Sequence, residues 1–538
     1  MALLEISDLN VSIGSTSILS KVSLQLNAGE VLGVAGESGS GKTMTALAIA
    51  GLLPASAKLT GNIVFDGTTV SDANDSEYCK IRGRELGIVF QEPMTALNPV
   101  MTIGNQVAET VRIHRSISRR DALQIARETL VKVGLPESRF PMNRYPHNLS
   151  GGQRQRVAIA IAMALKPKLL IADEPTTALD VTTQAEVLAL FRQLVKDDGI
   201  GLILVTHDLA VIAQTANRVA IMKAGEIVDM GPVGEIFRDS RQPYTRALLA
   251  NTKHVPLRAT AREVGPEPVL EARNVVREYA GPRKIFGKAA LFRAVDDVSL
   301  QVYANENVGL VGESGCGKST LLRTILGLDR AQSGEIRIFG KSFPDDRQRE
   351  MKQLRQHIQV VFQDPFGTFD PRWRVRQLIA ENFYLLDAPP TGMEARKKID
   401  EILEKVGLRS SDASKFPHEF SGGQRQRIAI ARALITEPAI IALDEAVSAL
   451  DVSIRAQILD LLADLSDRLG MSYLFVTHDL SVTRSITDRV LVMKDGRIVE
   501  QGRTADVFAR PAHPYTAELL GAIPDIDRAL QSASPEYS

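Results

Sequence analysis

The chain has 538 residues, which is enough for more than one domain. Lysine and arginine together number 64, as do aspartate and glutamate, so no overall basic field points to nucleic acid as a partner. Only two cysteines occur, Cys79 and Cys316, which excludes a disulfide framework and fits a reducing compartment. Residues 1–30 hold no secretory-type apolar run, and runs such as 157–165 are far shorter than the roughly 20 residues of a membrane span. We therefore expect a chain that is soluble by itself.

The first predicted element of the core is a short buried strand at residues 31–36, followed by a glycine-rich loop and a helix. The same order recurs at ENVGLVG, and both loops match G-x-x-x-x-G-K-[ST] in the strand–loop–helix context that this motif requires. Successive N–H groups can surround phosphate oxygens, the lysine can reach the β- and γ-phosphates, and the next hydroxyl can bind Mg²⁺. The predicted ATP-binding residues are Gly36, Ser38, Gly39, Gly41, Lys42 and Thr43, and Gly312, Ser314, Gly315, Gly317, Lys318 and Ser319.

The next strand of each half ends in glutamine, at Gln91 and Gln363. The segments IVFQEPMTALNP and VVFQDPFGTFDP place an acid and a proline after it, and the proline enforces an extended exit from the strand. Taken alone, this pattern is equally typical of a plain strand-to-loop boundary. Its recurrence at matching depth in both halves favours a functional role.

A helical stretch follows in each half and is expected to serve packing. Ser118-x-x-Asp121 and Thr391-x-x-Glu394 are typical of capping boxes, so both predict helix starts. The amphipathic runs after them close on Gly134 and Gly407, which are suitable C-terminal caps.

An internal repeat comes next and organises the whole sequence. Residues 149–180 read LSGGQRQRVAIAIAMALKPKLLIADEPTTALD, and residues 420–451, which lie 271 positions later, read FSGGQRQRIAIARALITEPAIIALDEAVSALD. Paired glycines disfavour a helix interior, so at a helix start they indicate bare backbone kept for a ligand. Free N–H groups at such a start attract anions, above all phosphates. The repeat therefore predicts two similar domains. Its ligand-binding residues are Ser150, Gly151, Gly152 and Gln153, and Ser421, Gly422, Gly423 and Gln424.

Acids and histidines at the ends of apolar strands complete each predicted site. PKLLIAD and PAIIALD end in an acid, where parallel sheets place ligands, and a glutamate follows each. The first acid fits Mg²⁺ and the second fits a base that polarises the attacking water. GLILVTHD and SYLFVTHD place a histidine at the same edge, which we assign to the γ-phosphate. These strand ends add Asp173 and Asp444 to the predicted metal ligands Thr43 and Ser319, and the predicted catalytic residues are Glu174, Glu445, His207 and His478.

Two tyrosines, Tyr244 and Tyr515, also lie 271 positions apart, beyond the nucleotide core. The proline-containing stretch after the first of them predicts a linker, and the chain end is typical of a loose tail. The expected division is a first domain at 1–252, a linker at 253–268, a second domain at 269–520 and a tail at 521–538.

The order of these motifs resembles that of ATP-binding cassette (ABC) ATPases over nearly the whole chain. The wording QEPMTALNP and the PYT-x-x-LL ending resemble the dipeptide/oligopeptide importer class, in particular its fused ATPases of the Yej-type peptide and microcin importers and of the glutathione importer. The resemblance implies two P-loop NTPase cassettes, each with a parallel-sheet core, an antiparallel β subdomain and a helical subdomain. It also implies a bacterial peripheral protein on the cytoplasmic face of the inner membrane. Two permease subunits and a periplasmic or extracellular solute-binding protein are the implied partners, and nucleic acid is not.

The resemblance further implies that the cassettes pair head to tail, so that each ATP lies between one P-loop and the other cassette's signature. One site would join Gly36–Thr43 with Ser421–Gln424, and the other would join Gly312–Ser319 with Ser150–Gln153. Gln91 and Gln363 would contact both Mg²⁺ and the permease, and Asp180 and Asp451 would make contacts across the dimer.

Three departures from the family pattern stand out. Ala446-Val447 replace Pro175-Thr176, which is expected to loosen the turn behind Glu445. No cysteine follows Cys316, so no iron–sulfur cluster is predicted, and Cys316 itself is interpreted as a small loop residue. Tyr279 matches the family's adenine-stacking aromatic residue, whereas Ile13 stands at that position in the first half.

Other functions compete with peptide import as interpretations of these motifs. A tandem-ABC translation factor acting on the ribosome would carry a long charged linker, unlike the short proline-containing one here. An importer ATPase for glutathione, an opine or a nickel chelate stays open, because the solute is selected by other subunits.

Overall fold

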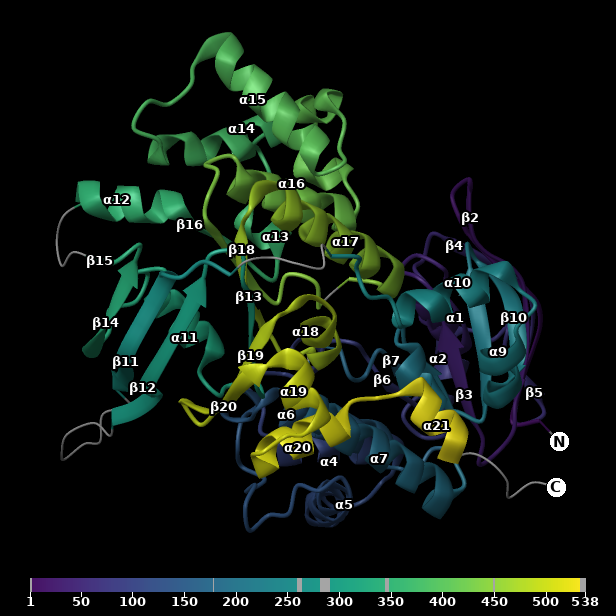
Figure 1. The fold of residues 1–538 in the computed structure, drawn as a ribbon. Coiled ribbons are helices and arrows are strands. Elements are labelled where there is room, and N and C mark those ends of the chain that lie inside the picture. Colours follow the sequence, from purple (N-terminus) through teal and green to yellow (C-terminus); the bar gives the residue numbers. More distant parts are fainter. Residues whose placement is uncertain are drawn as a thin grey trace.

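The computed structural model describes residues 2–177, 179–258, 264–280, 291–343, 348–448 and 450–532. These residues form two cassettes with the same order of elements, each built on a six-stranded and a four-stranded sheet (Figure 1). The predicted α/β class with two P-loop NTPase cassettes is therefore confirmed.

The six-stranded sheets carry the predicted sites. Five strands of each are parallel, and the last pairs antiparallel at one edge. The central strands are buried on both faces, as their continuous apolar runs predict. In sheet order, the first comprises β10 (Glu226–Pro232), β9 (Arg218–Lys223), β3 (Val31–Ala35), β8 (Gly201–Val205), β7 (Leu169–Asp173) and β6 (Leu86–Val89). The second comprises β16 (Ile358–Val361), β17 (Ile440–Asp444), β18 (Ser472–Thr477), β13 (Asn307–Val311), β19 (Arg489–Lys494) and β20 (Arg497–Arg503).

The four-stranded sheets are antiparallel and flank the cores. The first consists of β2 (Thr16–Leu26), β1 (Leu4–Ile13), β4 (Ala57–Phe65) and β5 (Thr68–Thr69). The second consists of β12 (Leu291–Tyr303), β11 (Pro268–Ala280), β14 (Ser333–Ile338) and β15 (Lys341–Ser342).

Helices cover the sheets and form the helical subdomains. In the first cassette they are α1 (Lys42–Ile49), α2 (Asp75–Ile81), α3 (Pro93–Ala96), α4 (Ile103–His114), α5 (Arg119–Lys132), η1 (Pro146–Asn148), α6 (Gly151–Met163), α7 (Val181–Asp198), α8 (Leu209–Thr215), α9 (Val233–Asp239) and α10 (Pro243–Thr252). In the second they are α11 (Lys318–Ile325), α12 (Gln348–His357), α13 (Pro365–Thr368), α14 (Val375–Ala380), η2 (Glu381–Leu385), α15 (Gly392–Lys405), η3 (Ser410–Ser414), η4 (Pro417–Glu419), α16 (Gly422–Leu434), α17 (Val452–Leu469), α18 (Leu480–Ile486), α19 (Thr504–Ala509), α20 (Pro514–Ala522) and α21 (Ile526–Ser532). None of these helices is both long and apolar enough to cross a membrane.

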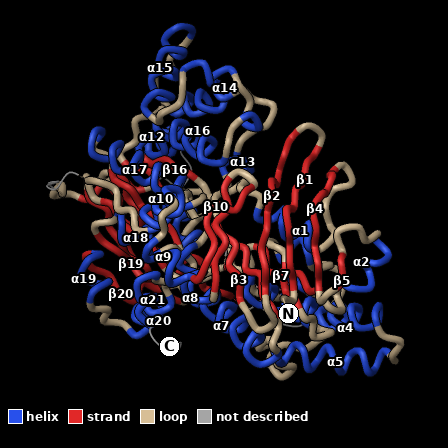
Figure 2. Tube along the Cα trace, turned by 90° about the vertical axis from the view of Figure 1, so that its right-hand side faces the viewer, coloured by secondary structure: helices blue, strands red, loops and turns tan. Residues whose placement is uncertain are grey.

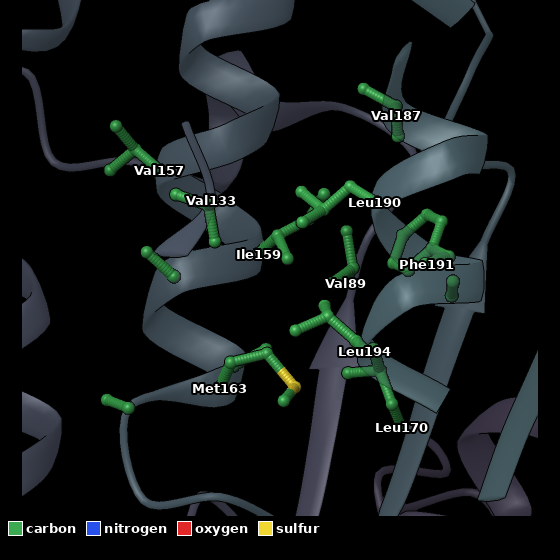
Figure 3. Packing of buried hydrophobic residues seen from close by; sticks show 14 of the residues in the cluster. Val89, Val133, Val157, Ile159, Met163, Leu170, Val187, Leu190, Phe191 and Leu194 are labelled. Atoms are coloured by element: carbon green, nitrogen blue, oxygen red, sulfur yellow. The ribbon is translucent and has the colours of Figure 1, made fainter. Parts of the chain in front are cut away.

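The signature helix α6 is fixed by a core shared with α7 and the central sheet. Figure 3 shows Ile159 and Met163 of α6 facing Leu190 and Leu194 of α7, with Val89 of β6 between them. All five side chains are at most 6 % exposed, so α6 and the strand ends form one rigid unit.

The helices that close each cassette pack on the other cassette. α10 of the first lies on α17 of the second, and α20 of the second lies on α7 of the first. The described part of the linker also contacts the second cassette, because His254 Nε2 lies 2.7 Å from Asp460 Oδ1 of α17. Residues 259–263 of the predicted linker lie outside the described residues.

The prediction of a loose tail is wrong for residues 526–532. They form α21, which crosses to the first cassette and packs on α8 and α9 (Figure 2). Ile526, Ala529 and Leu530, spaced at i, i+3 and i+4, form its buried face, and Lys253 binds Asp527 at 2.6 Å. Residues 533–538 of the predicted tail lie outside the described residues.

Neither predicted capping box forms in full, because the Asp121 carboxylate accepts from the Ser118 hydroxyl at 2.7 Å and not from the Ser118 N–H. The hydroxyl of Ser118 accepts a hydrogen bond from the Asp121 N–H at 3.1 Å and caps α5 as expected. Thr391 precedes α15 but caps nothing, because Gly392 has a φ of +57° and turns the first N–H groups away from the hydroxyl.

Candidate nucleotide sites

In both cassettes, four neighbouring strands deliver the predicted residues to one edge of the sheet. The order β3–β8–β7–β6 presents the P-loop, His207, the Asp173–Glu174 pair and Gln91 in turn. The order β13–β18–β17–β16 presents the second P-loop, His478, the Asp444–Glu445 pair and Gln363 in the same way. Because the carboxyl ends of parallel strands meet at one edge, residues more than 100 positions apart come together there.

The P-loops have a backbone that only glycine permits at their first position. Gly36 has a φ of +149°, and a Cβ there would lie 2.2 Å from the carbonyl oxygen of Met222. Gly312 has a φ of +154° and meets Met493 at the same distance. Cys316, in the second loop, is buried, and burial raises the pKa of its thiol, in keeping with a small neutral loop residue.

Each P-loop lysine is held inside its own loop. Lys42 Nζ donates to the carbonyl oxygens of Gly36 and Glu37 at 2.8 and 2.9 Å, and burial lowers its pKa. Lys318 Nζ makes the equivalent bonds to Gly312 and Glu313 at 2.7 and 2.8 Å. An ammonium group bonded to neutral carbonyl oxygens can exchange them for phosphate oxygens, because charged partners give the stronger hydrogen bond.

The acids at the ends of β7 and β17 fit a divalent cation. Thr43 Oγ1 donates to Asp173 Oδ1 at 3.3 Å, and burial raises the pKa of Asp173. Burial, followed by the charge of Glu445, raises the pKa of Asp444 to about 6, and its buried Oδ1 has no hydrogen-bond partner. An orphaned carboxylate oxygen beside the hydroxyl that follows the P-loop lysine suits Mg²⁺. Among the described residues, no group of three or more His, Cys, Asp or Glu side chains is placed to hold a metal ion.

The predicted base of the first site contacts three polar side chains. Glu174 accepts hydrogen bonds from Gln91 Nε2 and Thr177 Oγ1, both at 2.9 Å, and lies 3.1 Å from His207 Nδ1. Burial alone raises the pKa of Glu174, but the contact with His207 outweighs it and the pKa is lowered overall. The reciprocal contact raises the pKa of His207 against the effect of burial. Glu174 is therefore an ionised carboxylate, as a general base must be.

The predicted base of the second site contacts fewer polar side chains. Glu445 Oε1 lies 2.9 Å from His478 Nδ1, and the pKa of Glu445 is lowered overall although burial opposes it. Ser448, the counterpart of Thr177, donates to the backbone carbonyl of Glu445 and not to its carboxylate. In the described part of the chain, Gln363 is exposed and makes no hydrogen bond to Glu445.

The expected loosening of the turn behind Glu445 is wrong. Glu174 and Glu445 share the same strained backbone, with φ of +46° and +50°. Both donate their N–H to the neighbouring strand at 2.8 Å, Glu174 to Val205 and Glu445 to Val476. The strand sets this turn, so Ala446 and Val447 fill the place of Pro175 and Thr176 without altering it.

The signature segments begin their helices in the predicted way. Ser150 and Ser421 cap α6 and α16, and Gln153 and Gln424 bond back to them in reciprocal capping boxes. Gly152 and Gly423 lie against Thr183 and Ile454, where a Cβ would come within 2.4 Å of a side chain. No hydrogen bond among the described residues joins Ser150–Gln153 or Ser421–Gln424 to a P-loop.

The cassettes do meet at their P-loops, through the residues that follow the second acid. Asp451 Oδ1 accepts hydrogen bonds from the N–H and hydroxyl of Ser38, at 2.9 and 3.0 Å. On the other side, Thr182 Oγ1 lies 2.7 Å from Glu313 Oε1 of the second P-loop. Asp180 itself caps α7 through the N–H of Thr183 at 3.0 Å. Each cassette thus approaches the other's P-loop, but with a different residue.

Two residues have a place in the site that sequence reasoning did not assign. The hydroxyls of Tyr244 and Tyr515 accept hydrogen bonds from the first N–H inside each P-loop, that of Glu37 at 3.4 Å and that of Glu313 at 3.0 Å. Burial raises the pKa of Tyr244 to about 12 and also raises that of Tyr515, so both hydroxyls stay protonated. Their shared spacing of 271 positions was the available signal.

The adenine-stacking position differs between the cassettes. Tyr279, at the end of β11, is 38 % exposed, and its hydroxyl donates to Asp329 at 3.1 Å. The guanidinium of Arg277 lies over one face of the ring, 4.5 Å from its centre. Ile13 lies at the equivalent end of β1.

Paired P-loops, each with an acid pair and a histidine at the same sheet edge, define a P-loop ATPase. Residues 19–177 and 295–448 match the family model described as ABC transporter. Residues 499–536 match the model described as oligopeptide/dipeptide transporter, C-terminal region. This chain belongs to the ABC transporter family of ATP-binding proteins and is an ATPase.

Similar proteins align over nearly the whole chain. The chain is 42% identical over 542 residues to the glutathione import ATP-binding protein GsiA of Escherichia coli (strain K12), covering 95% of this chain and 87% of that protein. It is 41% identical over 560 residues to GsiA of Salmonella typhimurium (strain LT2), covering 97% and 90%. The dimeric post-hydrolysis structure of the cassette MJ0796 bound to ADP and Pi aligns at 31% identity and a TM-score of 0.40, covering 44% of this chain and 98% of that one.

Proposed function

We propose that this chain is the ATP-hydrolysing subunit of an importer for peptides or peptide-like solutes, glutathione among them. The observation that carries the proposal is the same set of ATPase residues at both sheet edges, joined to the C-terminal region of the oligopeptide/dipeptide class. The relatives' names, which specify glutathione import, support the solute class.

The partners of such a subunit are two multi-span permeases and a solute-binding protein outside the membrane. The chain would be peripheral on the cytoplasmic face of the inner membrane, with surfaces near Gln91 and Gln363 toward the permeases. The exposure of both glutamine side chains supports this assignment. We further propose the division into cassettes at 1–252 and 269–520, since α10 ends at Thr252 and β11 begins at Pro268.

In the proposed reaction, ATP phosphates replace the carbonyl partners of Lys42 and Lys318. Each nucleotide is enclosed when the opposite signature closes on it, Ser421–Gln424 over the first P-loop and Ser150–Gln153 over the second. Thr43 and Asp173, like Ser319 and Asp444, would hold Mg²⁺, with Gln91 and Gln363 beside it, and the ion when bound neutralises charge on the phosphates.

Glu174 and Glu445 act as general bases on the attacking water. Water attacks the γ-phosphorus, the bond to the β–γ bridging oxygen breaks, ADP leaves, and the carboxylate accepts the proton. His207 and His478 hold these carboxylates in line and face the γ-phosphate. The contacts of 3.1 and 2.9 Å between the histidine Nδ1 and glutamate Oε1 atoms support the pairing of each histidine with its glutamate.

Replacement of both bases tests the chemistry. The double variant Glu174→Gln/Glu445→Gln keeps shape and removes proton acceptance, so hydrolysis should fall by about 10²–10⁴ while ATP binding persists. Near wild-type hydrolysis in the double variant would show that these carboxylates are not the bases.

Purification and reconstitution test the transporter assignment. The tagged chain, extracted from membranes of its own host in mild detergent, should carry two multi-span proteins in equal amounts. Reconstituted in vesicles with its binding protein, the complex should take up labelled glutathione or short peptides only when ATP is on the cassette side. Recovery with ribosomes and without any permease would overturn the proposal in favour of a translation factor.

A further inference from the structure

Arg455 connects two parts of the second cassette that matter for hydrolysis. Its Nη1 donates to Asp479 Oδ2 at 2.9 Å, and its Nη2 donates to the carbonyl oxygen of Leu450 at 3.3 Å. The side chain is 21% exposed, so this is a largely dry ion pair. Leu450 immediately precedes Asp451, and Asp479 immediately follows His478.

This arginine completes a path of contacts from the first P-loop to the second base. Ser38 bonds to Asp451, and Arg455 lies one helical turn after Asp451 at the start of α17. Arg455 binds Asp479, which caps α18 through the N–H groups of Ser481 and Val482. His478 precedes Asp479 and contacts Glu445 at 2.9 Å.

The charge of Arg455 acts on both sides of the interface. Burial raises the pKa of Asp479, but the charge of Arg455, together with the hydrogen bonds from Ser481 and Val482 and the charge of His478, lowers it overall. Arg455 also opposes protonation of His207 in the first cassette. Consistent with that proximity, Asp451 and Val452 line one small hollow together with Gly36 and His207.

The first cassette lacks this path. Gln184 stands in place of Arg455, and its side chain makes no hydrogen bond among the described residues. Asp208, the counterpart of Asp479, caps α8 at 2.8 Å and has no cationic side chain on it in the described ranges. Asp180 caps its own helix and does not reach Ser314.

We propose that Arg455 is a positioning residue that couples engagement of the first P-loop to the base of the second site, with no equivalent link between the second P-loop and the base of the first site. When Ser38 moves, its hydrogen bonds to Asp451 move the start of α17. Arg455 then passes that movement to Asp479 and His478. Movement at the second P-loop reaches Thr182 and stops there, because Gln184 offers no equivalent link.

The internal repeat supplies a matched pair of variants, Arg455→Gln and Gln184→Arg. Turnover at one site is isolated with Glu174→Gln, which leaves the second site active, or Glu445→Gln, which leaves the first. In the Glu174→Gln background, Arg455→Gln should lower kcat about tenfold, the rate equivalent of one lost charge-assisted hydrogen bond, with KM for ATP changed less than about twofold. The loss in the Glu445→Gln background should be several-fold smaller, and Arg455→Lys should recover part of the second-site rate. Equal losses at the two sites, or no loss, would overturn the proposal.

The isolated rates rest on the proposed roles of Glu174 and Glu445, so a second readout avoids them. In Lys318→Ala protein, which directs nucleotide to the first site, adding ATP should change amide hydrogen exchange across α18. The change should disappear when Arg455→Gln is added and persist when Gln184→Arg is added. Persistence after Arg455→Gln refutes the relay, whereas hydrolysis by the Glu174→Gln/Glu445→Gln double variant refutes only the assigned bases.

Discussion

Asp451 of the second cassette and Ser38 of the first P-loop are joined by two hydrogen bonds, at 2.9 and 3.0 Å, to a single carboxylate oxygen. Asp180, in the same position of the repeat, accepts from Thr183 in its own helix. Two identical residues in nearly identical sequence therefore have different partners, one between cassettes and the other within one.

Alanine at these two positions should separate stability from activity. Asp180→Ala removes an N-cap and should cost about 1 kcal/mol of stability. Asp451 makes no capping bond to α17, so Asp451→Ala should cost less stability but reduce ATP hydrolysis about tenfold by freeing Ser38. Urea unfolding and steady-state hydrolysis of the two variants provide the comparison. A larger stability loss for Asp451→Ala would contradict the assigned roles.

Asp444→Asn should stabilise the nucleotide-free protein while it abolishes hydrolysis at the second site. The pKa of Asp444 is raised to about 6 in the folded state, so its proton is lost more readily on unfolding. Between its unfolded pKa and about 6, the native state binds more protons, and stability falls as pH rises through that window. Asparagine cannot ionise and escapes this loss, by about 1–3 kcal/mol at pH 7 after allowance for partial exposure.

The pH dependence supplies the control for Asp444→Asn. The variant and the wild type should unfold at similar temperatures near pH 4, where both carry a neutral group. The variant should gain an advantage up to about pH 6 that is constant above it. A gain that is already complete at pH 4 would show that the effect is not the ionisation of Asp444.

The two sites should differ in nucleotide affinity. Tyr279 is 38 % exposed, and stacking of a base on an aromatic ring is worth about 1–3 kcal/mol in single-stranded nucleic-acid binding. Ile13 recovers part of that by apolar contact, so the first site should bind ATP roughly tenfold more weakly. Titrations of Lys42→Ala and Lys318→Ala, each leaving one intact site, measure the two affinities.

Ile13→Tyr provides the converse test and should strengthen the first site alone. The alternative is that phosphate contacts dominate the affinity of both sites, so that the two affinities are equal. Equal affinities in the two lysine variants, or a tighter first site, would rule out the stacking difference.

The packing of α21 on the first cassette should be measurable with one buried and one exposed substitution. Leu530 is 9 % exposed, whereas its neighbour Gln531 faces solvent. Leu530→Asp should cost about 2–3 kcal/mol and open the tail to limited proteolysis, and Gln531→Asp should change stability by less than about 0.5 kcal/mol. Equal protease sensitivity of the two variants would show that this face does not hold the tail.

Sequence reasoning predicted the strands and the residues at their ends, because buried apolar runs and motif spacing are local properties. The sequence could not predict that Asp180 and Asp451 bind different partners. Both follow the same Ala-Leu sequence, and only the opposite cassette distinguishes them. For α15, the glycine at position 392 argued against a capping box, although Thr391 and Glu394 have the spacing that predicts one.

The helix α21 was missed for a different reason. Its apolar residues at 526, 529 and 530 have helical spacing, but the position near the chain end favoured a loose tail. The segment is short, and helices of that length are stable only when packed, here on a surface about 300 residues earlier in the chain.

Because α21 packs on the first cassette, the apolar surface of that cassette is covered only after the second cassette has been synthesised. The first cassette is translated with the apolar side of Leu209, Ile212 and Phe237 still uncovered, because its cover, α21, is translated only after the second cassette. Two separately translated halves would leave that surface exposed in the first, a patch prone to unwanted association. Fusion into one polypeptide therefore guarantees the first cassette its cover at equal stoichiometry.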